Sequence, residues 1–321
     1  MLTISIPSRI HITLIAMHEC DLRKNGGIGF SIQNMGAQAT FSISQENNVT
    51  IGRKKEKCKK SIEIEIILNK TCKLMNLSKF VEIHVINLPD FHSGLGSGTS
   101  LTLACIEGLL IINEVTYKDR DIINLSNRGG TSGIGIQTYF TGGFILDAGV
   151  NSDNTRHLPS SYAENISHHP SVIHRSPMPA WKIGVVIPEA SSRIDGEIEM
   201  NFFNRVCPIQ KNEAFEACYL SVFGITAAII DNDYNSFVKS ISRIQKTRWK
   251  SEEINEHCLA SQQIEYLLHL GADCVGMSSV GPALYFFSKN LSEVKSNFID
   301  RYGGYGFVSD MNNTGRTICL N

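Results

Sequence analysis

Three glycines alternate with other residues in the stretch His92-Ser-Gly-Leu-Gly-Ser-Gly-Thr-Ser100, directly before a run with helical spacing of apolar residues. Glycines let the backbone adopt conformations closed to other residues, and they bring bare N–H groups close to a ligand. The neighbouring hydroxyl groups and the N-terminus of the following helix add further donors for an anion. A plain turn between a strand and a helix would also use glycines. We expect phosphate or pyrophosphate oxygens to bind at Gly94, Leu95, Gly96, Ser97, Gly98, Thr99 and Ser100.

Two common phosphate-binding motifs do not fit this stretch. It lacks the Gly-Lys-Ser/Thr ending of a P-loop. A dinucleotide-binding fingerprint needs a second strand that ends in an acidic residue, whereas the segment that follows the helix, Asn113 to Asp119, shows no clear strand. What remains is a strand, the pattern Pro89-x-x-x-x-Gly-Leu-Gly-Ser-Gly, and a helix.

The elements around the loop alternate between strands and helices. Alternating apolar residues predict strands at 2–6, 10–14 and 81–85, a tight turn at 26–29, and a hairpin from 38–44 and 49–52. The helix after the glycine loop covers 101–112, with Ser97 or Thr99 as its N-cap. The basic run 53–60 is interpreted as a solvated loop or helix face, and only secondarily as an anion-collecting patch. Further strands are expected at 143–148, 181–187, 272–276, 284–288 and 317–320, and further helices at 212–230, 232–245, 257–270 and 291–302.

The order of the predicted elements indicates an α+β protein in two halves, and its charge makes a small molecule the default partner. The 321 residues allow two domains, 1–155 with the glycine loop and 156–321, joined near an irregular stretch at 151–179. With a formal net charge of −1 and 19% charged residues, the chain has no overall electrostatic attraction to nucleic acid or to an anionic membrane. The nine cysteines show no zinc-ligand spacing, and no signal peptide or apolar run of about 20 residues is evident. We therefore expect a cytoplasmic protein with small-molecule substrates.

Several motifs in order resemble one protein family. The segment from Leu88 to Ala104 resembles the phosphate-binding motif of the GHMP kinase superfamily, which implies its two-domain α+β fold. Seven blocks resemble, in order, the motifs of β-ribofuranosylaminobenzene 5′-phosphate synthases. They are Pro7 to Ile15, Gly26 to Phe30, His92 to Thr99, Arg128 to Gly135, Gly142 to Asp147, Gly196 to Glu199 and Ser278 to Tyr285.

The resemblance implies transfer of a ribose 5-phosphate group rather than of a phosphate. Such enzymes condense phosphoribosyl pyrophosphate with 4-aminobenzoate or 4-hydroxybenzoate, release CO2 and pyrophosphate, and join ribose and ring by a carbon–carbon bond. It also implies Mg²⁺, a homodimer and a place in methanopterin biosynthesis. A kinase of this fold typically has an Asp in the second glycine-rich segment to help activate an acceptor hydroxyl, and 129–139 contains neither Asp nor Glu. A base from elsewhere would keep an ATP-dependent kinase open.

The family motifs also suggest residue roles. Arg9, His11 and Arg128 are the expected catalytic residues, with Arg9 and His11 near the reacting ring and the cations near the departing pyrophosphate. Each has a structural alternative: an ion pair for Arg9, a solvent-facing strand position for His11 and a simple turn for Arg128. Substrate contacts are expected from Asn25, Gly26, Gly27, His92, Thr131, Ser132, Ser278 and Ser279.

The chain departs from the family pattern mainly at positions expected on the acceptor side. Two Asp residues of the pattern are replaced by Ala16 and Asn25, a Gln by Ser100, a His by Val150 and a Trp by Val280. Lost carboxylates and a lost imidazole would change charge and acceptor shape together. A C-nucleoside synthase that uses a heteroaromatic carboxylic acid and a non-catalytic ligand-binding relative therefore remain open.

Overall fold

One long β-hairpin runs through both halves of the molecule. The computed structural model describes residues 1–53, 55–152, 156–160, 162, 169–189, 194 and 196–320. Strands β1 (Leu2–Ala16) and β2 (Arg23–Ser44) pair antiparallel from end to end, with irregular register between Ile6 and Ser8 and between His11 and Thr13. The two strands predicted at 2–6 and 10–14 are thus one strand, and the turn predicted at 26–29 is wrong, because these glycines lie inside β2. A Cβ on Gly29 would come within 2.6 Å of Ile134, so close packing rather than a turn requires glycine there.

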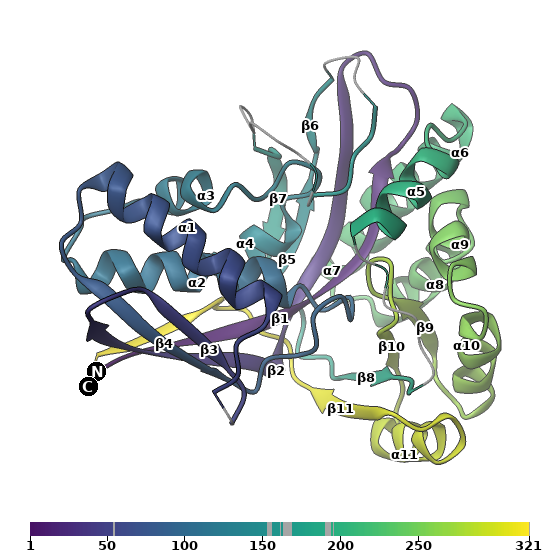
Figure 1. Cartoon of the computed structure of the whole chain (residues 1–321). Coiled ribbons are helices and arrows are strands. Elements are labelled where there is room, and N and C mark those ends of the chain that lie inside the picture. The colour runs from purple at the N-terminus through teal and green to yellow at the C-terminus, as the bar shows by residue number, and fades with distance from the viewer. Residues whose placement is uncertain are drawn as a thin grey trace.

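The N-terminal part is a sheet covered by helices. In the described part of the chain the sheet has eight strands, with the central order β12-β1-β2-β4-β3. Helices α1 to α4 pack on one of its faces (Figure 1). The further strands are β3 (Asn48–Ile51), β4 (Phe80–Ile86), β5 (Phe144–Asp147), β6 (Val150–Asn151), β7 (Val172–Ser176) and β12 (Thr317–Leu320). The helices are α1 (Lys59–Met75), α2 (Ser97–Ile112), α3 (Asp119–Ser126) and α4 (Ile134–Thr141).

The prediction that the segments 38–44 and 49–52 pair with each other as a hairpin is wrong. Strand β3 pairs parallel with β4, and α1 forms the crossover between them. Parallel neighbours need such a crossover, whereas a tight turn can join only antiparallel strands. The segment 38–44 pairs instead with β1 on one side and β4 on the other.

The C-terminal part is a smaller sheet with a larger share of helix. Among the described residues it has four antiparallel strands in the order β11-β8-β10-β9. The predicted helices at 212–230, 232–245, 257–270 and 291–302 are confirmed. The strands are β8 (Ile183–Ile187), β9 (Cys274–Met277), β10 (Leu284–Phe287) and β11 (Tyr305–Ser309). The helices are α5 (Gly196–Val206), α6 (Lys211–Tyr219) with a π-helical continuation into α7 (Ala227–Ile230), α8 (Tyr234–Ile244), α9 (Arg248–Asn255), α10 (Ala260–His269) and α11 (Leu291–Tyr302).

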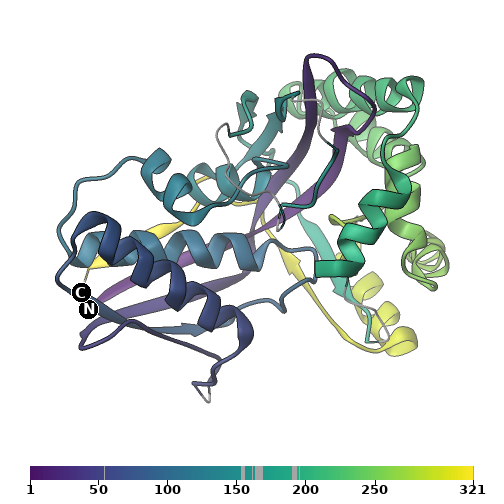
Figure 2. The ribbon, with the colours of Figure 1, turned by 45° about the horizontal axis from the view of Figure 1, so that its top comes forward.

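The two parts share a hydrophobic core. Ile10, Ile28 and Phe30 of the long hairpin pack in one cluster with Tyr285 and Phe287 of the smaller sheet. The chain ends return to each other, because β12 pairs with the start of β1, and both ends lie side by side in two views (Figures 1 and 2). The expected domain boundary, between residues 155 and 156, adjoins residue 155, which lies outside the described residues, so the division into 1–155 and 156–321 stays a prediction.

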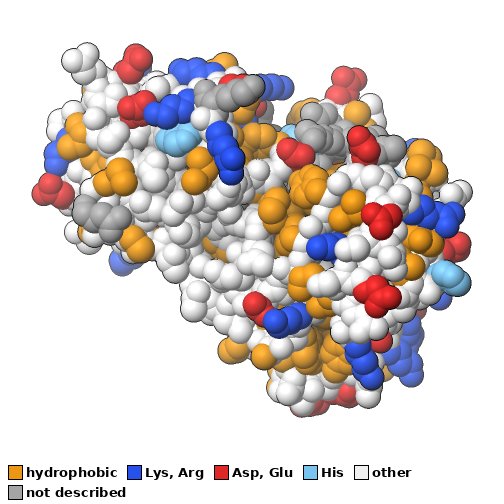
Figure 3. Space-filling model, turned by 90° about the horizontal axis from the view of Figure 1, so that it is seen from below, with side chains coloured by type: hydrophobic (Ala, Val, Ile, Leu, Met, Phe, Trp, Pro, Cys, Tyr) orange, Lys and Arg blue, Asp and Glu red, His pale blue; other side chains and the backbone are white. Residues whose placement is uncertain are grey.

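The molecular surface carries charges of both signs. Seen from below, acidic and basic side chains are interspersed over both lobes (Figure 3). Within the described residues one helical stretch, Lys211–Ile230, is long and apolar enough to cross a membrane, with mean hydropathy 1.5. Because 44% of its most apolar window is buried in the fold, a core helix explains the same composition.

Candidate active site

The glycine loop begins helix α2 in the left-handed backbone region that favours glycine. Gly96, with φ of 78°, occupies the N-cap position, so the prediction of Ser97 or Thr99 as the cap is wrong. A Cβ on Gly96 would lie 2.7 Å from Arg9 Cγ. Gly94, with φ of 89°, has the Ser278 carbonyl oxygen where its Cβ would be. The loop therefore needs both glycines to fit against Arg9 and the loop that follows β9.

Arg9 of β1 fastens the glycine loop to the long hairpin. Its Nη1 donates to the Gly94 carbonyl oxygen at 2.7 Å, and its backbone N–H donates to the Leu95 carbonyl at 3.1 Å. The Ser278 hydroxyl donates to the same Gly94 oxygen at 2.6 Å. Burial lowers the Arg9 pKa to about 10, against the opposing effect of Glu199 and Glu253. Among the described residues its buried Nε has no partner, which leaves a charged donor for a ligand.

Lys60 is a second cation at the start of α2, and Arg128 lies near Lys60. Lys60 Cε is 3.7 Å from the position of a Cβ on Gly98, and the Lys60 side chain is only 12% exposed. Burial and the nearby Arg128 charge lower the Lys60 pKa, while Glu63 pairs with it at 3.1 Å. Burial also lowers the pKa of Arg128. The interpretation of 53–60 as a solvated face is therefore wrong for Lys60, which lies against the predicted phosphate loop.

A cavity of about 120 Å³, which we call the reaction cavity, lies beside the loop and brings several predicted residues together. The sequence predictions Arg9, His11, Thr99, Thr131, Ser132 and Ser279 all line it, together with Gly129 and Gly135 of the second glycine-rich segment. The sequence reasoning did not single out three other lining residues, Glu199 and Phe203 of α5 and Glu253 of α9. For Glu199 a signal existed, since it ends one of the family-like motifs.

A hydrogen-bonded chain orients His11 in this cavity. His11 Nε2 lies 3.2 Å from Ser132 Oγ, and that hydroxyl donates to Asp147 Oδ2 at 3.2 Å. Since the serine proton points to Asp147, the Ser132 oxygen accepts from Nε2–H, and Nδ1 carries the lone pair. Nδ1 has no partner among the described residues, and burial, then Arg9 and Lys250, hold the His11 pKa well below its usual value. His11 is therefore a neutral base or acceptor.

The Asp147 carboxylate lies against the second glycine-rich segment, which contains no acidic residue of its own. It is 1% exposed, and it accepts backbone hydrogen bonds from Gly133 at 3.1 Å and Gly149 at 2.8 Å in addition to Ser132. Burial raises its pKa to about 6. Because both oxygens are engaged, Asp147 orients Ser132 and His11 and does not reach a substrate hydroxyl.

A buried ion pair supports the other wall of the reaction cavity. Lys250 is fully buried, and its Nζ donates to Glu253 Oε2 at 2.7 Å and to the Ser279 carbonyl at 2.9 Å. Ser279 has φ of 56°, and its N–H donates to the His11 carbonyl at 2.8 Å. Desolvation raises the pKa of Glu253 and lowers that of Lys250. The ion pair thus holds the strained turn at Ser279, and this turn binds the backbone carbonyl of His11.

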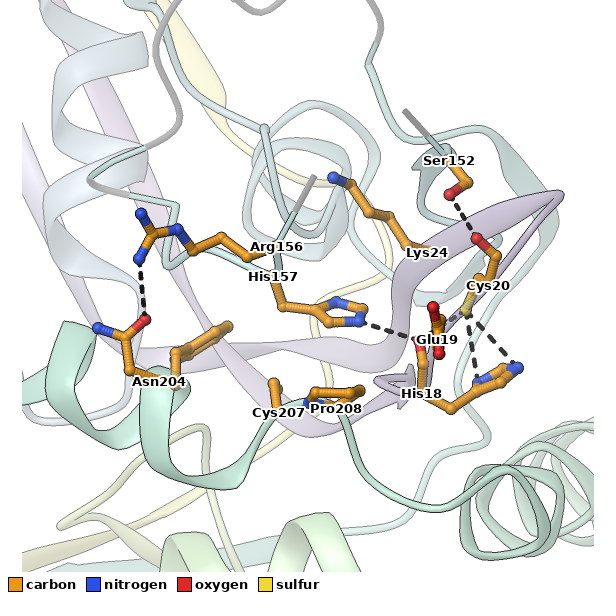
Figure 4. Close-up of a pocket in the computed structure, with 11 residues that line it drawn as sticks. His18, Glu19, Cys20, Lys24, Ser152, Arg156, His157, Asn204, Cys207 and Pro208 are labelled. Atoms are coloured by element: carbon orange, nitrogen blue, oxygen red, sulfur yellow. Dashed lines mark hydrogen bonds between the residues drawn. The ribbon is translucent and has the colours of Figure 1, made fainter. Parts of the chain in front are cut away.

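A second, larger pocket of about 560 Å³ adjoins the reaction cavity, and Phe203 lines both. We call it the hairpin pocket (Figure 4). Its walls come from the end of the β1–β2 hairpin, from the segment after β6 and from the C-terminal end of α5. The lining residues are His18, Glu19, Cys20, Lys24, Ser152, Arg156, His157, Phe203, Asn204, Cys207 and Pro208.

The remaining predicted residues lie in three places. Asn25 Oδ1 lies 2.7 Å from His157 Nδ1 at the hairpin pocket. Gly27 faces the reaction cavity, because a Cβ there would be 3.2 Å from His11 Nε2, and Gly26 packs against the backbone after β5. Exposed His92 does not line the reaction cavity.

Three of the departures from the family pattern lie next to residues of the hairpin pocket, although none of the three lines it. Ala16 is the register partner of Asn25 in the β1–β2 pairing, and Val150 is the register partner of Lys24. Val280 lines the reaction cavity, and Ser100 donates back to the Gly96 carbonyl inside α2.

No group of three or more His, Cys, Asp or Glu side chains that could hold a metal ion occurs within the described ranges. Magnesium on a polyphosphate needs only one or two protein carboxylates, because phosphate oxygens and water complete its shell. Glu199, which lines the reaction cavity with Thr99 of the glycine loop, meets that smaller requirement.

The fold and its anion-binding helix start define a protein with the GHMP-kinase-like fold. The structure superimposes on homoserine kinase from Cytophaga hutchinsonii with a TM-score of 0.70 at 16% identity, covering 99% of this chain and 97% of that one. For mevalonate diphosphate decarboxylase from Staphylococcus aureus the TM-score is 0.63 at 14% identity, with 100% and 99% covered. These similarities establish the predicted α+β fold and leave the reaction open.

Sequence relatives identify the family within that fold. The chain is 30% identical over 308 residues to β-ribofuranosylphenol 5′-phosphate synthase of Archaeoglobus fulgidus, covering 96% of this chain and 94% of that protein. It is 31% identical over 290 residues to the enzyme of the same name from Methanothermobacter thermautotrophicus, with 88% of each covered. No family model matches the chain. The chain belongs to the β-ribofuranosylphenol 5′-phosphate synthase family, and it is an enzyme of phosphoribosyl transfer, a pentosyltransferase.

Proposed function

We propose that this enzyme transfers the phosphoribosyl group of phosphoribosyl pyrophosphate to an aromatic acid of the 4-hydroxybenzoate or 4-aminobenzoate type. The transfer forms a C-riboside 5′-phosphate and releases CO2 and pyrophosphate. The observation that carries the proposal is the approach of Arg9 and Lys60 to the glycine loop, with Arg128 near Lys60, beside a cavity where the second glycine-rich segment itself has no carboxylate and Asp147 is already hydrogen-bonded to it. This arrangement suits the stabilisation of a leaving pyrophosphate.

The glycine loop would hold the pyrophosphate as it departs. Backbone N–H groups at the helix start and the positive end of the α2 dipole bind phosphate oxygens. The Arg9 guanidinium and the Lys60 ammonium add charge on two sides of the loop. Removing one such preorganised donor from an anion hole typically costs about 10²–10³-fold in kcat. The cations at the loop are thus the main catalytic groups of the donor side.

Bond changes balance without a protein nucleophile. The bond between ribose C1′ and the pyrophosphate oxygen breaks, and its electron pair leaves with pyrophosphate. The ring carbon that bears the carboxylate forms a bond to C1′. The bond to the carboxylate then breaks, and its electron pair restores the aromatic ring as CO2 departs. His11, held in one tautomer by Ser132 and Asp147, would accept a hydrogen bond from the ribose or the acceptor at Nδ1.

Magnesium belongs to the proposal, with Glu199 and the pyrophosphate oxygens as its ligands. When bound, the ion would neutralise negative charge on the leaving group. A cytoplasmic location, a homodimer and a role in methanopterin assembly are further parts of the same proposal, and they follow from the family resemblance.

A heteroaromatic carboxylic acid is the second candidate acceptor. It is favoured by Ala16, Asn25 and Val150, which stand where the family pattern has carboxylates and an imidazole. They neighbour the hairpin pocket through contacts of Asn25 with His157 and of Val150 with Lys24. The donor and the bond changes would be the same.

Turnover of purified protein tests the proposal. The protein is incubated with Mg²⁺, phosphoribosyl pyrophosphate and a panel of benzoic and heteroaromatic carboxylic acids, and pyrophosphate and CO2 are measured. We expect both products in equal amounts with at least one acid and none without the acid. Pyrophosphate without CO2, or ATP turnover with a sugar alcohol, would contradict the proposal.

A further inference from the structure

Two buried polar atoms of strand β1 lie without partners at the reaction cavity. Arg9 Nε and His11 Nδ1 are both buried, and neither has a hydrogen-bond partner within the described part of the chain. Both residues line the reaction cavity. Buried polar groups are normally hydrogen-bonded, because an unpaired one is costly. A donor and an acceptor left open in one cavity therefore indicate that a bound molecule pairs with them.

The two atoms come from the same face of β1. Residues two apart on a strand point to the same side and are separated by about 6.6 Å along the chain. The register of β1 with β2 is regular from Arg9 to His11, whereas Ile10 between them is fully buried in the hydrophobic core. One small molecule in the cavity can therefore reach both side chains.

Arg9 Nε lies at the phosphate end of the cavity. A Cβ on Gly96, the N-cap of α2, would be 2.9 Å from Nε, and a Cβ on Gly135, near the start of α4, would be 3.8 Å away. The atom thus lies between two glycines at the starts of two helices. Guanidinium donors pair well with phosphate oxygens. An anion held by the glycine loop is therefore the expected partner of the Arg9 Nε–H group.

His11 Nδ1 can accept a hydrogen bond and cannot donate one. Ser132 Oγ receives the Ile134 N–H at 3.3 Å and gives its own proton to Asp147, so His11 Nε2, at 3.2 Å, carries a proton toward it. The neutral imidazole then has its lone pair on Nδ1. An ionised phosphate or carboxylate offers only acceptor oxygens and cannot pair with this atom. A hydroxyl group can.

We propose that His11 Nδ1 accepts a hydrogen bond from the 2′-hydroxyl of the phosphoribosyl donor and makes this enzyme selective for ribose over 2-deoxyribose. This inference rests on the proposed function. The pyrophosphate and the 2′-hydroxyl of the donor are on adjacent carbons and on the same face of the ring. A donor whose pyrophosphate is at Arg9 therefore brings that hydroxyl to the next position along the strand. The 3′-hydroxyl is one carbon farther from the pyrophosphate.

The protein holds the His11 ring ready for this hydrogen bond. Its backbone N–H donates to Ser278 Oγ at 3.0 Å, and its carbonyl accepts from the Ser279 N–H at 2.8 Å. Nε2 is held by Ser132 and adjoins Gly27, where a Cβ would be 3.2 Å away. A site built to bind a substrate hydroxyl rejects the analogue that lacks it, because the buried acceptor then stays unpaired. A 2-deoxy donor would leave Nδ1 in that state.

Donor binding tests the assignment without the chemical step. Calorimetry is done with Mg²⁺ and no acceptor, for phosphoribosyl pyrophosphate and for its 2-deoxy and 3-deoxy analogues. In the wild type the 2-deoxy analogue should bind about 10- to 100-fold more weakly than the parent donor, because it leaves a buried acceptor unpaired. The 3-deoxy analogue should lose less affinity than the 2-deoxy analogue.

Two variants of His11 separate recognition from a merely structural role. His11→Leu removes the acceptor, whereas His11→Asn keeps an amide oxygen near the position of Nδ1. We expect His11→Leu to bind the parent and the 2-deoxy donor equally well, and His11→Asn to keep part of the preference. A structural role would weaken both donors alike and leave the preference unchanged. His269→Leu, the same change at an exposed histidine of α10, is the matched control and should keep the full preference.

The outcomes separate this inference from the proposed function. If the wild type turns over an aromatic acid but binds the 2-deoxy donor as tightly as the parent, the assignment of His11 is wrong and the proposed reaction stands. The same holds if His11→Leu keeps the preference, or if the 3-deoxy analogue loses more affinity than the 2-deoxy analogue. If the preference is present in the wild type and lost in His11→Leu, but no CO2 is released, the assignment stands and the proposed reaction fails.

Discussion

Replacing Lys250 with Met leaves the Glu253 carboxylate buried without its ion-pair partner. The lysine is fully buried and the glutamate is 2% exposed, so solvent cannot replace the lost 2.7 Å contact. Breaking a buried pair by removal of one partner typically costs about 3–5 kcal/mol. We expect Lys250→Met to lower the free energy of unfolding by about that amount at pH 8. The double variant Lys250→Met/Glu253→Gln removes the stranded charge and should recover more than half of the loss.

The loss should depend on pH with a defined sign. Burial already raises the Glu253 pKa above 4.5, and removal of Lys250 takes away the largest opposing effect. A carboxyl group whose folded-state pKa is raised contributes stability that is present below its unfolded pKa and lost as pH rises through the folded value. The deficit of Lys250→Met should therefore be smaller at pH 5 than at pH 8.

Urea unfolding followed by tryptophan fluorescence measures this effect, because the buried Trp249 adjoins Lys250. Equal losses at pH 5 and pH 8, or a double variant no more stable than the single one, would show that the ion pair does not act as described. An exposed partner pair such as Lys79 and Glu114, with side chains 38% and 82% exposed, supplies the control. Lys79→Met should cost less than about 1 kcal/mol at either pH.

Three further predictions concern the reaction itself. Lys60→Met and Arg128→Ala should each raise the KM for phosphoribosyl pyrophosphate at least tenfold and leave the acceptor KM unchanged. Unaltered turnover in Arg128→Ala would remove that residue from the site. Gly96→Ala should abolish donor binding by calorimetry, because its φ is 78° and its Cβ would meet Arg9, and binding within twofold of the wild type would refute the close fit. Since the Asp147 pKa is about 6, wild-type kcat should fall as pH drops through 6 and Asp147 loses its charge. Asp147→Asn should show a lower kcat without that inflection, and an unchanged profile would place the titration elsewhere.

The sequence was sufficient for elements whose apolar period is unambiguous. The helix at 291–302 and the strand at 317–320 agree with the structure to the residue. Helix α1 was not predicted, since its run Ile62-Glu-Ile-Glu-Ile66 alternates at period two, which is typical of a strand. The packing of α1 across β3 and β4 prevails over that local pattern.

The sequence predicts the glycine loop as the donor side of the site, but it does not reveal all the charged side chains around the site. A loop with alternating glycines before a helix has a local physical meaning, so the spacing together with the family motifs predicts phosphate binding at Gly94 to Ser100, and this assignment stays a prediction. Lys60 and Glu253 have no such signal, because each stands in a charged run that resembles a solvated helix face. Only tertiary packing turns Lys60 to the start of α2 and buries Glu253 beside Lys250.

A fold shared with kinases is consistent with a pentosyltransferase because the two reactions make the same demand on the donor side. Both must stabilise charge on phosphate oxygens, and the glycine loop with Arg9 and Lys60 is the part of the site that we propose for this role. They differ at the acceptor, where a kinase needs a base for a hydroxyl group. Here Asp147 is committed to Ser132 and to two backbone N–H groups, Glu253 of the reaction cavity is paired with Lys250, and Glu199 is the proposed ligand of magnesium. In the proposed reaction, the loop therefore holds the group that leaves rather than one that is passed on.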